Sequence, residues 1–350
     1  MFDALLWRWV PLAAALLLNG CSTLDYYSHL AGGQLHLLQA REPIAELLEN
    51  PTADPELKQR LARAQQARDF ASAQLSLPDN DSYRLYADIQ RPFVVWNVFA
   101  TPEFSLSPEL HCFPIAGCVA YRGFYSQGRA RGSAALLKQQ GLDTYLGGVE
   151  AYSTLGWFDD PILNTMLRWS DERLVAVIFH ELAHQQLYVA NDTAFNESFA
   201  SFVEREGLSQ WRIKQGLPPN DPQGEQQREQ FIALVLASRT RLQQLYASDL
   251  PPAQMRSGKQ AEIARLRAEY HALSKREWGG NGRYDDWINA PINNAKLLPF
   301  GLYDQWVPAF AALFEQVERD WPRFYQRVAA LGELPERERH QALMDLSAGS

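Results

Sequence analysis

The stretch "VIFHELAHQQLYVANDTAFNESFASFVEREG", residues Val177 to Gly207, contains His180 and His184 four residues apart, with Glu181 between them. On a helix, side chains four residues apart lie on the same face, so both imidazoles can bind one ion at about 2.0–2.1 Å. Glu181 directly follows the first histidine and can reach a water molecule bound to that ion. The spacing therefore predicts a helix that binds Zn²⁺, with Glu181 as a catalytic base.

A third metal ligand is expected on the helix that follows. A catalytic zinc has three protein ligands and one open position. Glu197 in "NESFA", thirteen residues after His184, offers the third ligand. The residues in between include Asn191 and Asp192, which favour a turn, so the second helix can return facing the first. We therefore predict His180, His184 and Glu197 as the metal ligands.

Two further side chains in this stretch have more than one possible role. Glu204 lies two helical turns beyond Glu197 on the same face, and we expect it to contact a ligand or to bind the amine of a substrate rather than to bind the metal. Asn196 is either a helix cap or a hydrogen-bond donor to a ligand, and the sequence does not rank these roles. The remaining histidines are scattered and are expected to be structural or on the surface: His29, His36, His111, His271 and His340.

Composition and charge restrict the class of protein. The chain has ten Trp, fourteen Tyr and seventeen Phe in a 46% hydrophobic composition, which is typical of a folded protein. The net charge of -8 and the absence of a stripe of Lys and Arg argue against nucleic acid as a partner. A length of 350 residues allows two domains, or one large domain with an added lobe.

The beginning of the chain resembles an export signal. Trp9 to Leu18 is an uncharged apolar run of about ten residues, whereas a membrane-spanning helix needs roughly 20. We therefore predict a signal peptide over residues 1–20.

The letters "LLNGC", Leu17 to Cys21, resemble a bacterial lipobox, in which the cysteine is lipidated and becomes the first residue of the mature chain. This predicts a lipid anchor at Cys21 that holds the protein in a membrane of the bacterial cell envelope, facing the periplasm. An ordinary cleaved signal and a simple apolar anchor are the alternatives, and Asn19 is an uncommon lipobox residue. Ser22, in place of Asp, favours the outer membrane over the inner one.

The other two cysteines are close in sequence. Cys112 and Cys118 stand in "HCFPIAGCVAYRG", where Pro114 and Gly117 can turn the chain back on itself. An oxidising envelope permits a bond between them, so we predict a small loop closed by a disulfide. Two free, buried cysteines are the alternative. A pair of cysteines is too few for a zinc site, even with His111 adjacent.

Helical and strand patterns divide the rest of the chain. Residues 21–50 are expected to be a tether that merges into the fold, and Asp54 to about Leu77 has helical periodicity that ends at Pro78. Between Tyr83 and Tyr152, short apolar and aromatic runs broken by Gly and Pro predict a small sheet.

The second half of the chain has mainly helical patterns. Ser170 or Asp171 is the expected cap of the helix with the two histidines, and Gly207 is expected to end the next helix. From Glu225 to about Trp278, two long helices of mixed charge are expected to form a solvated hairpin.

The predicted fold class is therefore α+β, with a small mixed or antiparallel sheet and a mostly helical C-terminal half. We expect one zinc-binding domain over residues 51–350. Within it, residues 51–165 supply a helix and the sheet, and residues 166–350 supply the active-site helices and a helical lobe.

Several segments resemble a bacterial family of predicted aminopeptidases, which are zinc metallopeptidases with an HExxH helix and a glutamate on the following helix. They are the lipobox, "HCFPIAGCVAYRGFYS", "GGVEAYSTLGWFDDPILNTM", the stretch Val177–Gly207 and "NNAKLLPFGLY". The resemblance implies a zincin-like, thermolysin-like core of the gluzincin type. It also implies His180, His184 and Glu197 as zinc ligands and Glu181 as the catalytic base.

Hydrolysis of a peptide bond needs further groups. A donor must stabilise the oxyanion, and Tyr152 and Tyr303 are candidates because they lie in matching segments and tyrosine is common in this role; packing is the alternative for each. "GGVEAYSTLG" is the expected edge strand along which an extended peptide can add. Glu150 in that strand is a candidate to bind the substrate's α-ammonium, with a plain surface charge as the alternative.

Three functions are compatible with these features. The first is zinc-dependent removal of residues from the N-terminus of peptides in the cell envelope. The second is cleavage within envelope proteins. The third is a non-catalytic zinc-stabilised scaffold that binds a protein partner through its helical hairpin, and Glu181 argues against it because a structural site has no use for a base. No feature identifies a protein partner.

Overall fold

The computed structural model describes residues 23–113, 117–151, 153–218, 222–300 and 305–348. The fold is α+β and mostly helical with small sheets, which confirms the α+β class predicted from the sequence. An N-terminal helix covers residues 23–39. The helices that follow are α2 (Ile44–Glu49), α3 (Pro55–Leu75), α4 (Gln127–Gln139), α5 (Asp171–Gln186), α6 (Thr193–Lys214), α7 (Pro222–Tyr246), α8 (Pro252–Glu277), α9 (Asp285–Asn289), α10 (Asn294–Leu297), α11 (Val307–Gln316), α12 (Trp321–Gly332) and α13 (Glu336–Ala348), with a short 3₁₀ helix at Met166–Arg168.

Across the residues that the structure describes, the strands form three small sheets. They are β1 (Arg41–Pro43), β2 (Leu85–Ala87), β3 (Val95–Pro102), β4 (His111–Phe113), β5 (Gly117–Val119), β6 (Arg122–Phe124), β7 (Leu142–Val149) and β8 (Ile162–Leu163). One sheet has the order β6-β3-β7 and is antiparallel, and a mixed sheet has the order β1-β2-β8. The third is the hairpin β4-β5.

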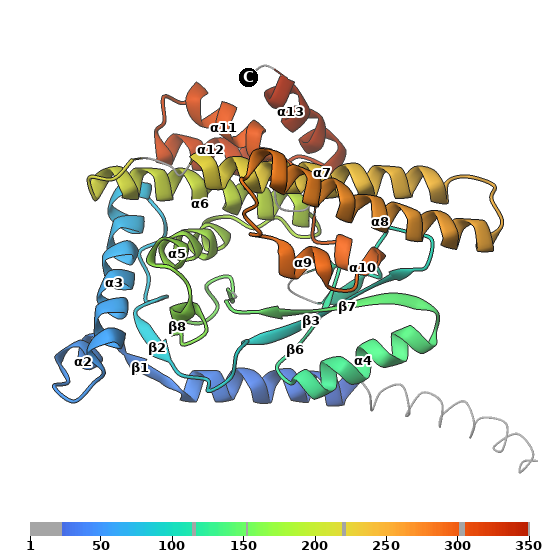
Figure 1. Cartoon of the computed structure of the whole chain (residues 1–350). Helices are drawn as coiled ribbons and strands as arrows, with labels where there is room; N and C mark the ends of the chain where they lie inside the picture. The colour runs from blue at the N-terminus through green and yellow to red at the C-terminus, as the bar shows by residue number, and fades with distance from the viewer. Residues whose placement is uncertain (1–22, 114–116, 152, 219–221, 301–304, 349–350) are drawn as a thin grey trace, which may run out of the picture.

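The two faces of the β6-β3-β7 sheet pack against different helices. Val98 of β3 points to one face, where it is buried with Phe124 and with Ala130 of α4. Phe99, its neighbour, points to the other face and packs with Ala295 of α10. This alternation is the period of two expected for a strand covered on both faces. Figure 1 shows α4 and the N-terminal helix along one face of the sheet, and α9 and α10 on the other.

The N-terminal helix differs from the expected tether. Tyr26 and Leu37 are buried, and the Tyr26 hydroxyl donates to the carbonyl of Gly123 in β6 at 3.0 Å. A Cβ added to Gly33 would lie 2.2 Å from the Tyr125 ring, so this glycine permits close approach of the helix. Residues 23–50 are therefore part of the fold: Tyr26 packs on the sheet, and Leu37 and Ile44 are buried in the main core.

The helix α6 also differs from expectation, because Gly207 does not end it and it continues to Lys214. A Cβ added to Gly207 would lie 2.7 Å from Leu75 of α3 and 2.9 Å from Phe179 of α5. The glycine therefore stands at a point of close approach between α3, α5 and α6. A glycine that is needed for packing has the same sequence signature as one that stops a helix.

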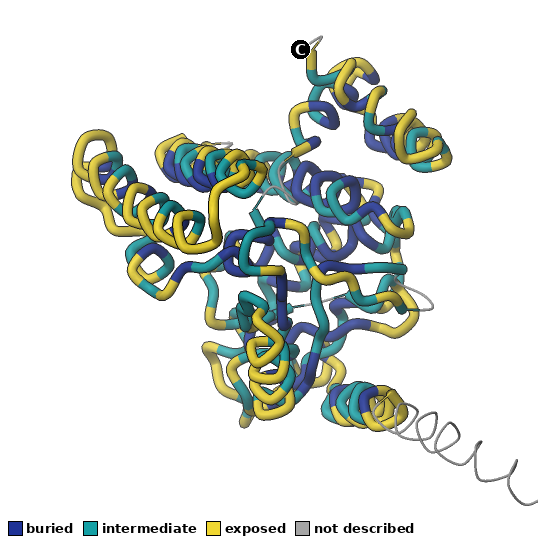
Figure 2. The backbone as a smooth tube through the Cα atoms, turned by 90° about the vertical axis from the view of Figure 1, so that its right-hand side faces the viewer, coloured by how far each residue is buried: buried dark blue, intermediate teal, exposed yellow. Residues whose placement is uncertain are grey.

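The main core joins α3, α5 and α6 to the C-terminal helices α11, α12 and α13. Ser170 caps α5 by accepting the N–H of Arg173, which resolves the choice between Ser170 and Asp171. Asp192 caps α6 and is itself bound at 2.8 Å by the buried Arg339 of α13. Figure 2 shows the buried segments concentrated in the middle of the molecule.

The predicted helical hairpin is confirmed as α7 and α8, which form a lobe with α9 and α10. This lobe has its own core, which includes Phe231, Leu266 and Tyr270. It is joined to the sheet by Lys259, whose Nζ donates to Asp143 of β7 at 2.5 Å. Within the described ranges, the helices are too short or too polar to cross a membrane.

Candidate metal centre and active-site cleft

The helices α5 and α6 bring the three predicted metal ligands together. His180 Nε2 lies 3.2 Å from His184 Nε2 and 3.4 Å from Glu197 Oε2, and His184 Nε2 lies 3.7 Å from the same oxygen. A tetrahedral zinc with bonds of about 2.0–2.1 Å holds its ligand atoms roughly 3.3 Å apart. The triangle of donor atoms therefore has the size and the chemistry that a zinc ion needs.

Glu204 lies outside this triangle. Its Oε2 is 2.9 Å from Nδ1 of His180. When Nδ1 is protonated and donates to this carboxylate, Nε2 is left as the metal-binding nitrogen. The structure therefore places Glu204 against His180, a candidate metal ligand, and such a contact is one of the two roles expected for it.

Asn196 takes neither of the roles considered from the sequence. Its Oδ1 accepts the N–H of Val189 at 2.8 Å, and its Nδ2 donates to the carbonyl of the same residue at 2.7 Å. Asn196 is fully buried and holds the turn between α5 and α6 against the second helix. The cap of α6 is Asp192 instead.

Burial and charge perturb the acids of the site. Burial raises the pKa of Glu181 above its usual range, against the opposing effect of the two histidines. Burial alone would also raise the pKa of Glu197, but the neighbouring His184 and His180 outweigh it and lower that pKa to about 2. For His180, the hydrogen bonds with Glu197 and Glu204 outweigh burial, so its pKa is well above its usual value. Three carboxylates around two imidazoles favour a cation.

The cluster opens into a cleft of about 700 Å³. His180, Glu181, His184 and Glu197 all line it. Its other walls come from separate parts of the chain: β3, the residues after β5, the end of β7 with the loop that follows, and Arg228 and Pro299 of the lobe. A cleft of this size with convergent polar groups is the usual form of a substrate site.

Glu150 lines the cleft directly after the edge strand β7. Its Oε2 accepts a hydrogen bond of 2.6 Å from the indole N–H of Trp169, and the Arg173 guanidinium lies 4.0 Å away. Glu150 is therefore a half-buried carboxylate with a fixed orientation, not a free surface charge.

Three predicted site residues lie outside the described residues. They are the lipidation candidate Cys21 and the two candidate oxyanion donors, Tyr152 and Tyr303. The signal peptide expected over residues 1–20 also lies outside them.

Two other tyrosines line the cleft and were not singled out from the sequence. Burial raises the pKa of Tyr121, and the charge of Glu197 adds to this effect. The same two causes raise the pKa of Tyr188. Tyr188 stands four residues after His184 in the sequence, but α5 ends at Gln186 and Tyr188 lies beyond that end, so helical spacing could not have placed it in the cleft.

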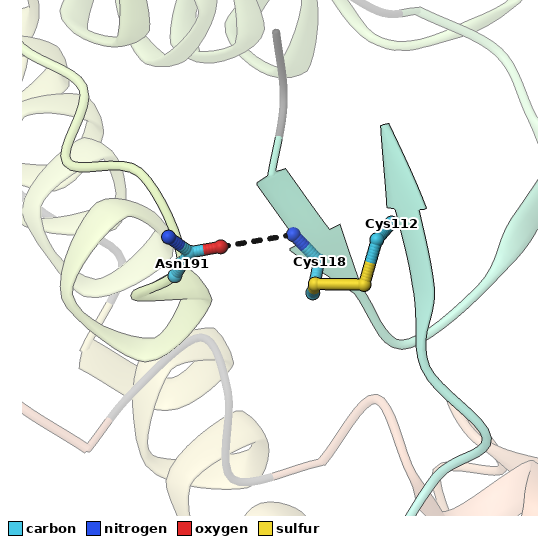
Figure 3. Close-up of a disulfide and its surroundings, with 3 residues drawn as sticks. All are labelled: Cys112, Cys118 and Asn191. Atoms are coloured by element: carbon cyan, nitrogen blue, oxygen red, sulfur yellow. Dashed lines mark hydrogen bonds between the residues drawn. A yellow bond between two sulfur atoms is a disulfide. The ribbon is translucent and has the colours of Figure 1, made fainter. Parts of the chain in front are cut away.

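The predicted disulfide is confirmed. Cys112 of β4 and Cys118 of β5 are opposite each other in the hairpin and are joined by a disulfide. Figure 3 shows that the N–H of Cys118 also contacts Asn191 in the turn between α5 and α6.

A buried carboxylate beside a compact cluster of two histidines and a glutamate, inside a cleft, is an arrangement found in hydrolases. A comparison with protein families agrees with this class. The model of the family described as "Putative aminopeptidase" matches residues 25–343, and the chain belongs to that family. No curated protein and no solved structure matches the chain. Membership of the family indicates a hydrolase with a peptide substrate.

Proposed function

We propose that the protein is a zinc-dependent peptidase with a zincin-like core of the gluzincin type, which removes residues from the N-terminus of peptides. His180, His184 and Glu197 hold the Zn²⁺. The observation that supports this most directly is the triangle of donor atoms, 3.2 to 3.7 Å on a side, whose residues line the cleft. The chemistry that a bound Zn²⁺ supplies is a lowered pKa of water, toward about 7, and a polarised scissile carbonyl.

Glu181 acts as the base. It is buried and lines the cleft beside the donor triangle. Burial raises its pKa, so the carboxylate takes up a proton more readily than a solvated one does. Glu181 accepts the proton of the attacking water and passes it to the leaving amine.

The oxyanion is stabilised by a tyrosine hydroxyl of the cleft. Among the described residues, Tyr121 and Tyr188 are the candidates, because both line the cleft and both interact electrostatically with Glu197. Tyr152 and Tyr303 remain predictions for the same role.

The edge strand β7 orients the substrate. Gly148 and Val149 at its end line the cleft, so an extended peptide can add to this edge through backbone hydrogen bonds. Glu150 follows them and binds the α-ammonium of the peptide, with its orientation fixed by the Trp169 indole. This charge pairing favours cleavage at the N-terminus.

An endopeptidase of the cell envelope is the second candidate function. The observation that favours it is Arg173, which lies 4.0 Å from the Glu150 carboxylate and competes with a substrate ammonium for it. An enzyme that does not need the ammonium would cleave peptides with blocked N-termini.

The location in the cell is proposed from the sequence. A lipid anchor at Cys21 would hold the protein in the envelope, on the periplasmic side of the outer membrane, and a disulfide agrees with an oxidising compartment. Labelling of cells with an alkyne fatty acid should mark the wild-type protein and leave Cys21→Ser unmarked. Equal labelling of both proteins would exclude this anchor.

The function is tested by metal analysis and a peptide-cleavage assay on the same preparation. We expect one zinc per chain, cleavage of peptides with a free N-terminus and little cleavage of their acetylated forms. Glu181→Gln should keep zinc and lose roughly 10²–10⁴ in kcat, because only the proton transfer is removed. His184→Ala should lose both zinc and activity.

Each assignment has its own contradicting outcome. Equal cleavage of free and acetylated peptides would show an endopeptidase. Normal turnover by Glu181→Gln would exclude it as the base. Retained zinc with no hydrolysis over a broad peptide library would show a structural metal site.

A further inference from the structure

The disulfide-closed hairpin is a small unit that needs support. β4 and β5 have three residues each and form a two-stranded sheet of their own. A hairpin of this size is marginally stable in water by itself. The Cys112–Cys118 bond spans a sequence separation of six, and so short a loop contributes less to global stability than a long one. Its main effect is therefore local, on the shape of the hairpin.

One contact joins this hairpin to the turn between α5 and α6. Asn191 Oδ1 accepts the N–H of Cys118 at 3.0 Å (Figure 3). Gly117 has a φ of +72°, and a Cβ on it would lie 2.4 Å from the same oxygen. Asn191 has a φ of 68°, which asparagine tolerates better than most residues. Gly117 thus leaves room for the Asn191 side chain, and the backbone of Asn191 has a conformation that asparagine tolerates.

The contact links two parts of the active site. On one side, Asn191 directly precedes Asp192, the cap of α6, and this helix bears Glu197. On the other side, residues 119–121 directly follow Cys118 and line the cleft. The bond from Asn191 therefore sets the position of this wall of the cleft, which we call the 119–121 wall, relative to the second metal-binding helix.

We infer that Asn191 and the Cys112–Cys118 bond are positioning elements that hold the 119–121 wall against the turn between the two metal-binding helices. The catalytic part of this inference rests on the proposed function. Neither element has to touch the substrate; both act through the placement of Tyr121 in the cleft. The metal ligands themselves lie on α5 and α6, so loosening the hairpin should reduce turnover and leave zinc binding intact.

Three variants separate the elements of this contact. Asn191→Gly removes the acceptor and keeps a residue that adopts positive φ freely. Asn191→Asp keeps the acceptor oxygen and is the conservative rescue. Cys112→Ser combined with Cys118→Ser removes the covalent bond.

The readouts are amide hydrogen exchange of residues 119–121, zinc content and steady-state kinetics. For Asn191→Gly and for the double serine variant we expect exchange about tenfold faster and kcat about tenfold lower, with one zinc per chain and a similar KM. Asn191→Asp should remain within about twofold of the wild type in all three readouts.

A matched control is Asn164→Ala. Asn164 Oδ1 also accepts a hydrogen bond from a distant backbone N–H, that of Ile89 at 3.1 Å. The sequence separation of that pair is 75 residues, close to the 73 residues between Asn191 and Cys118. Its loss should leave exchange at residues 119–121 unchanged.

Unchanged exchange in both Asn191→Gly and the double serine variant would overturn the inference. Faster exchange with wild-type kcat would overturn the positioning role and leave the proposed function standing. If the wild type hydrolyses no peptide, the proposed function fails, and the exchange data alone decide whether the contact holds the wall.

Discussion

At the scale of single residues, the carboxylate of Glu204 contacts His180 on the side away from the other candidate metal ligands. Its contact with Nδ1 leaves Nε2 directed at His184 and Glu197. The helical spacing could place Glu204 on the correct face of its helix. It could not decide between contact with a ligand and contact with a substrate, because that depends on how α5 lies against α6.

Replacement of Glu204 by Gln should weaken zinc binding by about 10- to 100-fold, because the amide orients the imidazole less well than the carboxylate does. Competition with a chelator measures the Kd, and activity should return at excess zinc. Glu206→Gln is the matched control on the same helix, since Glu206 pairs with Arg319 and Gln210 instead. Equal zinc affinities of the two variants would contradict the role of Glu204.

Asp160 is a second residue with a measurable effect. It is buried, and its carboxylate accepts the N–H of Thr154 at 2.8 Å. Burial raises its pKa from 3.8 to about 6, and the charge of Glu181 acts in the same direction. The native state therefore holds this proton more tightly than the unfolded chain does. The contribution of Asp160 to stability is lost as the pH rises from about 4 to about 6.

Asp160→Asn removes this titration and keeps a carbonyl acceptor for Thr154. Between about pH 4 and pH 7 the wild type should lose the stability that Asp160 contributes, whereas the variant should not. The difference in unfolding free energy, variant minus wild type, should therefore increase by on the order of 1–3 kcal/mol. Urea denaturation at the two pH values measures it. Asp159→Asn, at the exposed neighbouring position, is the control. A pH-independent difference for Asp160→Asn would contradict the assignment.

At the scale of elements, local patterns predicted α3, α5 and the hairpin of α7 and α8, because each has clear helical periodicity or a capping residue. The helix of residues 23–39 and the full length of α6 were not predicted. In both, a glycine was needed for close packing, Gly33 beneath Tyr125 and Gly207 beside Leu75. Packing across the molecule is not visible in a local pattern.

Gly207→Ala should destabilise the protein. The added Cβ would meet Leu75 at 2.7 Å and Phe179 at 2.9 Å. Such overpacking costs about 1–3 kcal/mol against a gain in helix propensity of about 1 kcal/mol, so the expected net loss of stability is up to about 2 kcal/mol. Gly132→Ala in α4 is the control, because open space surrounds that position, and it should raise the melting temperature slightly. A stabilising Gly207→Ala would show that the three helices can separate without cost.

At the scale of the whole molecule, the cleft is assembled from segments far apart in sequence. The candidate metal ligands come from the single stretch Val177–Gly207, and for this reason the sequence could predict that His180, His184 and Glu197 come together. Tyr121 and Arg228 reach the same cleft through the hairpin and the lobe. Their place depends on how these units dock, which the sequence did not indicate.

A nearly buried ion pair contributes to the docking of the lobe, beside hydrogen bonds that Asn293 and Asn294 donate to backbone carbonyls of the sheet region. Lys259→Ala should lower the free energy of unfolding by about 2–4 kcal/mol, because it leaves the Asp143 carboxylate without its cation. Arg256→Ala removes the more exposed pair with Glu103 on the same helix and should cost at most about 1 kcal/mol. Thermal melting of both variants measures the difference. Equal shifts would indicate that Lys259 does not hold the lobe.

The salt bridge between Arg339 and Asp192 joins residues 147 positions apart. Contacts within α5 and α6 are local in sequence. This salt bridge instead closes a long loop of the chain, which costs conformational entropy and makes the contact slower to form. We therefore expect that in refolding from denaturant the two helices form early and that tight binding of the proposed Zn²⁺ lags behind, until α13 docks onto the N-terminal end of α6.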